Sequence, residues 1–155
     1  DQDDVWMPNK ISFLRQYFEI HSNVMLLMHD MYNASNEEID KKLLSVTSFG
    51  KRKRKNGFLY NTIYNGYYGC CMAFKREFLN ILLPFPAYNM PYDQWISLIA
   101  EYKKKAAFID KPLIVHRKHG NNVSHHCGFS EQISTRYKTL KAVYITLKRE
   151  KKRLR

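Results

Sequence analysis

Residues 1–11 of the chain read DQDDVWMPNKI, with three carboxylates in four positions ahead of an aromatic residue and a proline. Asp1 and Asp3 are two residues apart, so on an extended backbone their side chains project to the same side. Paired carboxylates suit a hard divalent cation such as Mg²⁺ or Mn²⁺, and such ions commonly hold phosphate groups. The alternative is a local role, in which Asp4 caps a helix that starts at Pro8.

The composition indicates one globular domain with a polyanionic partner. The 155 residues are 45% hydrophobic, which is enough to build a core. The formal net charge is +12, and the positive charge gathers in three runs at 51–55, 103–105 and 148–155. A chain with this charge suits nucleic acid, an anionic membrane or a phosphate-bearing substrate.

The cysteines and the apolar runs argue against two classes of protein, disulfide-stabilised and membrane-spanning. There are three cysteines, of which Cys70 and Cys71 are adjacent, so a disulfide framework is not expected and a reducing compartment is favoured. No apolar stretch approaches the roughly 20 residues of a membrane span.

Alternating helix and strand patterns predict an α/β fold. Helices are expected at about 8–18, 75–83, 93–104 and 130–149, and strands at 24–28, 69–74, 106–109 and 113–115. Segment 33–56 is expected to be an exposed connection that carries a short helix. The last helix is expected to pack through one apolar side, formed by Ile133, Tyr137, Leu140, Val143, Tyr144 and Leu147.

Three further segments carry residues suited to chemistry. Residues 66–77 read GYYGCCMAFKRE, residues 83–95 read LPFPAYNMPYDQW, and residues 112–123 read PLIVHRKHGNNV. Taken alone, Asp93 in the second of these is expected to be a helix N-cap, since it stands at a predicted helix start.

Together with residues 1–11, these segments resemble, in order, motifs of the family-2 glycosyltransferases with the GT-A fold, especially the rhamnosyltransferase-like branch. The resemblance implies the C-terminal part of a GT-A domain, a Rossmann-like mixed sheet flanked by helices. Residues 1–128 would form its metal- and acceptor-binding half, and residues 129–155 a basic amphipathic helix. A nucleotide-binding half is then expected upstream, and these 155 residues are expected to be inactive alone.

The resemblance also assigns roles. Asp1, Asp3 and His119 would hold Mg²⁺ or Mn²⁺ at the donor diphosphate, and Asp93 would be the general base. The residues expected to contact donor or acceptor are Trp6, Gly69, Cys70, Tyr92, Trp95, Arg117 and Asn121. The chain departs from the family where His-Asp-Trp-Trp is replaced by Tyr92-Asp93-Gln94-Trp95, and at His116, where tyrosine is commoner. Because of these departures, the resemblance does not identify the acceptor.

The implied activity is metal-dependent, inverting transfer of a sugar from a nucleotide-diphosphate donor, such as dTDP-rhamnose or a UDP-sugar, to a hydroxyl of a cell-surface glycan or lipid-linked acceptor. Cytoplasmic placement at the inner face of the membrane is expected, with residues 148–155 docking on anionic lipid.

Three alternatives remain open. The charge and the many tyrosines also fit a nucleic-acid-binding module, although no finger, helix-turn-helix or RNA-binding strand motif is present. A non-catalytic remnant of the GT-A fold is a second alternative. The third is a structural zinc site formed by His116, His119, His125, His126 and Cys127.

Overall fold

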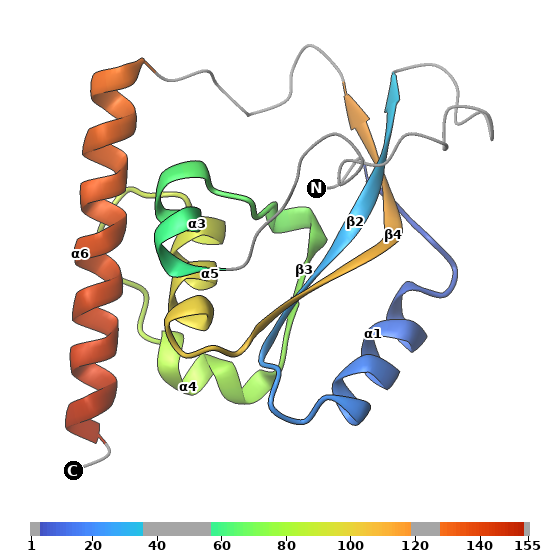
Figure 1. Cartoon of the computed structure of the whole chain (residues 1–155), viewed down its shortest axis with the longest axis horizontal. Helices are drawn as coiled ribbons and strands as arrows, with labels where there is room; N and C mark the ends of the chain where they lie inside the picture. Colours follow the sequence, from blue (N-terminus) through green and yellow to red (C-terminus); the bar gives the residue numbers. More distant parts are fainter. Residues whose placement is uncertain (1–3, 36–56, 119–127, 154–155) are drawn as a thin grey trace.

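The computed structural model describes residues 4–35, 57–118 and 128–153. Within these residues the chain forms an α/β fold, with a mixed, strongly curled four-stranded sheet and five helices (Figure 1). The α/β class predicted from the sequence is confirmed. The strands are β1 (Val5–Trp6), β2 (Leu26–Ser35), β3 (Met72–Phe74) and β4 (Ala106–Lys118). The helices are α1 (Lys10–Ile20), α3 (Phe58–Tyr64), α4 (Leu79–Leu82), α5 (Tyr92–Tyr102) and α6 (Phe129–Arg153), with 3₁₀ turns η2 (Gly69–Cys71) and η3 (Arg76–Phe78).

The strand order is β1-β4-β2-β3, with β2 and β4 parallel and the two outer pairs antiparallel. Opposite β4, the register shifts on both sides of Asp30: His29 pairs with Ile109, and Asp30 pairs with Pro112. A proline lacks the N–H that a regular ladder needs, so this irregularity accommodates it. The two short strands predicted at 106–109 and 113–115 are therefore one interrupted strand.

Both faces of β2 are covered, which explains its continuous apolar start. Leu26 and Met28 belong to the main core with α4, α5 and α6, whereas Leu27 packs with Leu14 of α1 and with Leu113. Figure 1 shows α1 on one side of the sheet and the other helices on the opposite side. Central strands covered on both faces are expected to be apolar at successive positions.

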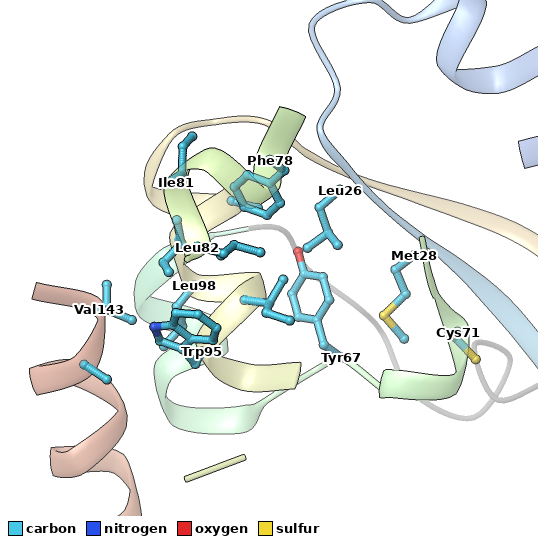
Figure 2. Packing of buried hydrophobic residues seen from close by; sticks show 14 of the residues in the cluster. Leu26, Met28, Tyr67, Cys71, Phe78, Ile81, Leu82, Trp95, Leu98 and Val143 are labelled. Carbon is cyan, nitrogen blue, oxygen red and sulfur yellow. The ribbon is translucent and has the colours of Figure 1, made fainter. Parts of the chain in front are cut away.

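The helix α6 packs against the core through small residues, which the sequence pattern did not predict. Its fully or nearly fully buried side chains are Thr139, Ala142, Val143 and Thr146. Figure 2 shows Val143 beside Trp95 and Leu98 of α5. Small side chains allow α6 to approach α5 closely, and the larger apolar groups are left outside. The predicted packing face is therefore correct only for Val143 and the partly buried Leu147, and it is wrong for Ile133, Tyr137, Leu140 and Tyr144, which are exposed.

Arg149 of α6 closes the C-terminal end of α4. Its guanidinium donates to the carbonyl oxygens of Ile81, Leu82 and Pro84 at 3.1, 2.9 and 2.8 Å. Arg149, one of the basic residues near the end of the chain, therefore has a structural role. None of the described helices combines the length and the apolar character that crossing a bilayer requires.

The helix α3 was not predicted; the short helix that the sequence suggested fell within 33–56, and residues 36–56 lie outside the described part. A buried carboxylate holds α3 in place. Glu101 of α5 accepts hydrogen bonds from Gly57 N, Asn61 Nδ2 and Tyr67 Oη at 3.0, 3.1 and 2.8 Å. Hydrogen bonds to a charged acceptor are stronger than neutral ones, so this tertiary network fixes a helix that its own aromatic sequence does not favour.

Candidate functional site

The strand β1 brings the start of the described chain against β4. Val5 pairs with Val115, and Asp4 lies beside His116, with 2.8 Å between Asp4 Oδ1 and His116 Nδ1. The Asp4 side chain is 1% exposed and that of His116 is 18% exposed. The local cap role considered for Asp4 is therefore wrong: Asn9 is the N-cap of α1, and Asp4 is held by a histidine 112 residues away.

The turn η2 places a thiol next to this pair. Potential ligand atoms of Asp4, Cys70 and His116 all lie within 4.8 Å of one another. The Sγ atoms of Cys70 and Cys71 are 3.9 Å apart, and this contact lowers the pKa of Cys70, while burial opposes it. Both thiols are free, as predicted.

Lys10 adds a buried positive charge beside these groups. It is 5% exposed, and its ammonium lies 4.3 Å from the centroid of the Trp6 ring. Burial lowers the pKa of Lys10, while the neighbouring Cys71, Cys70 and Asp4 raise it. Lys10 belongs to the quoted segment 1–11, but its place near η2 depends on the fold.

His29 is a buried neutral histidine. Its Nδ1 lies 2.7 Å from the Asp30 carbonyl oxygen, a geometry in which Nδ1–H donates. Burial, followed by the charge of Lys10, lowers the pKa of His29 to about 4 despite this hydrogen bond. His29 therefore carries no charge at neutral pH.

Asp93 lies in the first turn of α5, whose N-cap position is occupied by Pro91. The N-cap role expected for Asp93 is therefore wrong. Asp93 Oδ1 accepts a hydrogen bond from Gln94 N at 2.7 Å. Burial raises the pKa of Asp93, and hydrogen bonds from backbone groups that include Gly69 offset part of this effect.

Gly69 lies between two parts of the site, because its backbone contacts Asp93 and the next residue in the chain is Cys70. A methyl group at position 69 would overlap the hydroxyl of Tyr92 and lie 2.8 Å from its Cζ. Glycine therefore permits the close approach of Tyr92 to η2. The Tyr92 side chain is 57% exposed, so a ring face is available to a ligand beside Asp93.

The other predicted site residues are distributed as follows. Trp6 is 57% exposed, whereas Trp95 is fully buried in the core and does not present its ring to a ligand. Arg117 is half-buried on β4, where it pairs with Ala34 of β2. The remaining predicted ligands Asp1, Asp3, His119 and Asn121 lie outside the described residues, as do His125, His126 and Cys127 of the alternative zinc site.

Three residues of this site, Asp4, Lys10 and His116, were given no catalytic or binding role by the motif resemblance. All three lie within quoted segments, Asp4 and Lys10 in residues 1–11 and His116 in residues 112–123, so membership of those segments was the available signal. The contact between Asp4 and His116 depends on strand register, which the sequence does not display.

Comparison with protein-family models and with curated proteins finds no significant match.

Proposed function

We propose that the chain forms the metal- and acceptor-binding half of a family-2 glycosyltransferase with the GT-A fold. The supporting observation is that Asp4, η2, the start of α5 and the C-terminal part of β4 lie close together. Contacts run from Asp93 to Gly69, while the adjacent Cys70 lies near Asp4 and His116. The resemblance to the family lies in the same four segments, which are far apart in the sequence.

In the proposed reaction Asp93 is the general base. The acceptor hydroxyl gives its proton to the Asp93 carboxylate as its oxygen attacks the anomeric carbon of the donor. The bond from that carbon to the nucleoside diphosphate breaks, and the configuration inverts. Because burial raises the pKa of Asp93, its carboxylate is a stronger base than an exposed aspartate.

Two exposed aromatic rings are available to bind a sugar. Tyr92 and Trp6 are each 57% exposed, and flat ring faces pack well against the apolar faces of sugars.

The proposed metal ion is Mg²⁺ or Mn²⁺, with Asp1, Asp3 and His119 as its ligands. The described positions nearest to these residues are Asp4, which directly precedes β1, and Lys118, the last residue of β4; β1 and β4 are antiparallel neighbours, which supports a ligand set drawn from both segments. The bound ion would neutralise the charge of the leaving diphosphate. Arg117 would add a second positive group there, and Asn121 is assigned to the same donor and acceptor region.

The donor is proposed to be a nucleotide sugar, such as dTDP-rhamnose or a UDP-sugar, and the acceptor a glycan or a lipid-linked saccharide. An exposed amphipathic surface on α6 supports peripheral contact with an anionic membrane. We call this surface the outer α6 face; it comprises Ile133, Tyr137, Lys138, Leu140, Lys141, Tyr144, Ile145, Lys148, Lys151 and Lys152. Apolar and basic side chains on one exposed side are typical of helices that bind at a lipid surface.

The metal proposal is tested by replacing one predicted ligand. In the complete enzyme, Asp3→Ala is expected to abolish the response to Mn²⁺ and to weaken nucleotide-sugar binding together, since the ion links the two. Calorimetry with the donor, with and without chelator, measures both effects. Asp110→Asn removes an exposed carboxylate and serves as the control. Donor binding that does not respond to chelator contradicts the assignment.

The membrane proposal is tested by neutralising three exposed lysines of the outer α6 face. Replacing Lys148, Lys151 and Lys152 by glutamine is expected to weaken binding to anionic liposomes by about 1 kcal/mol per lysine at low salt. The difference should shrink as salt rises, because exposed charges are screened. Sedimentation with anionic and neutral liposomes measures it.

The control for this experiment replaces Arg15, Arg76 and Lys111, which are exposed residues outside α6, by glutamine. It removes the same charge, whereas Arg149 is left intact because it holds α4. Equal loss of binding in both variants would show that net charge, and not the outer α6 face, governs the contact.

A further inference from the structure

The side chains of Asp4, Cys70 and His116 form a cluster that the proposed reaction does not use as metal ligands. We propose that they bind Zn²⁺ at a site separate from the Mg²⁺ or Mn²⁺ of the transfer reaction. Their ligand atoms lie within 4.8 Å of one another, and no other such group occurs in the described part of the chain. Asp4 directly precedes β1, Cys70 lies in η2 and His116 lies on β4, so the fold assembles the site.

The donor types select the ion. A thiolate, an imidazole and a carboxylate are the three ligand types that Zn²⁺ takes in proteins, whereas Mg²⁺ prefers oxygen alone. One carboxylate and one thiolate together balance the two positive charges of Zn²⁺. The Asp4 side chain is 1% exposed and lies 2.8 Å from His116, and the ion would neutralise the charge of this buried carboxylate.

The geometry requires only a small adjustment. Ligand atoms at about 2.0–2.3 Å from a tetrahedral zinc ion are roughly 3.3–3.8 Å apart. The 2.8 Å contact between Asp4 and His116 would open slightly, and the Cys70 thiol would move inward. Pairing of Val5 with Val115 already fixes the two strands on which Asp4 and His116 lie.

Three protein ligands leave one coordination position open, which is the arrangement of zinc sites that bind water or a ligand. Lys10 adds a positive charge next to the balanced set of ion, carboxylate and thiolate. The open position therefore suits an oxygen with negative character. By joining η2 to β1 and β4, the ion would also fix the turn whose Gly69 contacts Asp93.

Co²⁺ substitutes for Zn²⁺ and reports its ligands by absorption, so it is the probe of choice. The purified, reduced full chain is titrated with Co²⁺ and then with Zn²⁺. We expect the visible spectrum of tetrahedral Co²⁺ and a near-ultraviolet band from thiolate-to-cobalt charge transfer, both abolished when Zn²⁺ displaces Co²⁺. Excess Mg²⁺ should leave both bands unchanged. The melting temperature should rise with Zn²⁺ concentration, because the ion binds the folded state.

Matched variants identify the ligands. Cys70→Ser, which changes one atom, should remove the charge-transfer band, while Cys71→Ser and Cys127→Ser should keep it. Asp4→Asn and His116→Ala should each weaken Co²⁺ binding at least about tenfold, because even losing an outer-sphere partner of a ligand costs that much. Circular dichroism of each variant checks that the fold is retained.

Two results would overturn the proposal: no Co²⁺ or Zn²⁺ binding by the reduced full chain, or a charge-transfer band that survives Cys70→Ser. A band lost only with Cys127→Ser would assign the zinc to the histidine-rich segment instead. None of these measurements uses a sugar donor, so their failure is distinguishable from failure of the glycosyltransferase proposal.

Discussion

Asp93→Asn is expected to lower the turnover of the proposed transfer reaction by about 10²–10⁴-fold, the contribution that a positioned general base typically makes. The amide cannot accept the proton of the acceptor hydroxyl. Its oxygen can still accept the hydrogen bond that Gln94 N donates to Asp93 at 2.7 Å, so the start of α5 should be preserved. Donor affinity should remain near that of the wild type, because the base acts on the acceptor. Transfer kinetics and calorimetry with the donor measure the two quantities separately.

The proposed role of Asp93 gives the pH dependence of the proposed reaction a defined sign. Burial raises the pKa of Asp93, and catalysis requires its carboxylate, so the rate should fall as the pH drops through a value above the ordinary range of an aspartate. A raised pKa in the folded state also means that ionisation of Asp93 destabilises the fold. The folded state is therefore more stable while Asp93 is protonated at low pH, and this extra stability is lost as the pH rises through the pKa of Asp93 in the folded state. Asp93→Asn should therefore be at least as stable as the wild type at neutral pH.

The control for Asp93 is Asp110→Asn, which removes an exposed carboxylate at the irregular part of β4. It should leave turnover and the acid limb of the pH profile unchanged. Near-wild-type transfer by Asp93→Asn would remove Asp93 from the mechanism.

Helices with a clear apolar period were predictable from the sequence. The helices α1, α5 and α6 appear within a few residues of the predicted ranges. The strand β2 was predicted to end at Met28, yet it continues to Ser35 through the buried polar residues His29 and Asp30. Polar residues hide a strand from a hydrophobicity pattern, and here the side chains of His29 and Asp30 supply hydrogen bonds to the backbone where the pairing with β4 is irregular. The same limit applies to the outer α6 face, since periodicity finds an apolar stripe but does not show whether it faces the core.

In the candidate site, too, some residues were predictable from the sequence, whereas the contacts between them were not. Asp93 and Gly69 were identified through motif resemblance, and the structure places the Asp93 carboxyl group in hydrogen-bond contact with the Gly69 backbone. The contact between Asp4 and His116 depends on the antiparallel register of β1 and β4, because a shift by one residue would turn Asp4 to the other face. Local patterns cannot encode that register. Trp95 is the opposite case, because its motif suggested a sugar-site role while tertiary packing places it in the core.

Trp95→Ala is expected to lower the free energy of unfolding by about 3–5 kcal/mol, the usual cost of truncating a buried large aromatic residue. Trp95 is fully buried, and its ring centroid lies 5.3 Å from that of Phe85. Figure 2 shows it between α6 and the other core side chains of α5. Removing the indole leaves a cavity where α5 meets α6. Urea unfolding of the purified protein, compared at constant slope, measures the loss.

The matched control is Trp6→Ala, which removes the same side chain from an exposed position on β1. Exposed substitutions usually change stability by less than about 0.5 kcal/mol, so this variant should unfold nearly as the wild type does. If Trp6 provides a stacking face, the same variant should instead raise the KM for the acceptor. The reverse outcome, with Trp95→Ala stable but defective in acceptor binding, would place Trp95 in direct contact with the sugar and would contradict the packing described here. The pair of variants therefore separates an aromatic residue that holds the site in place from one that binds the ligand.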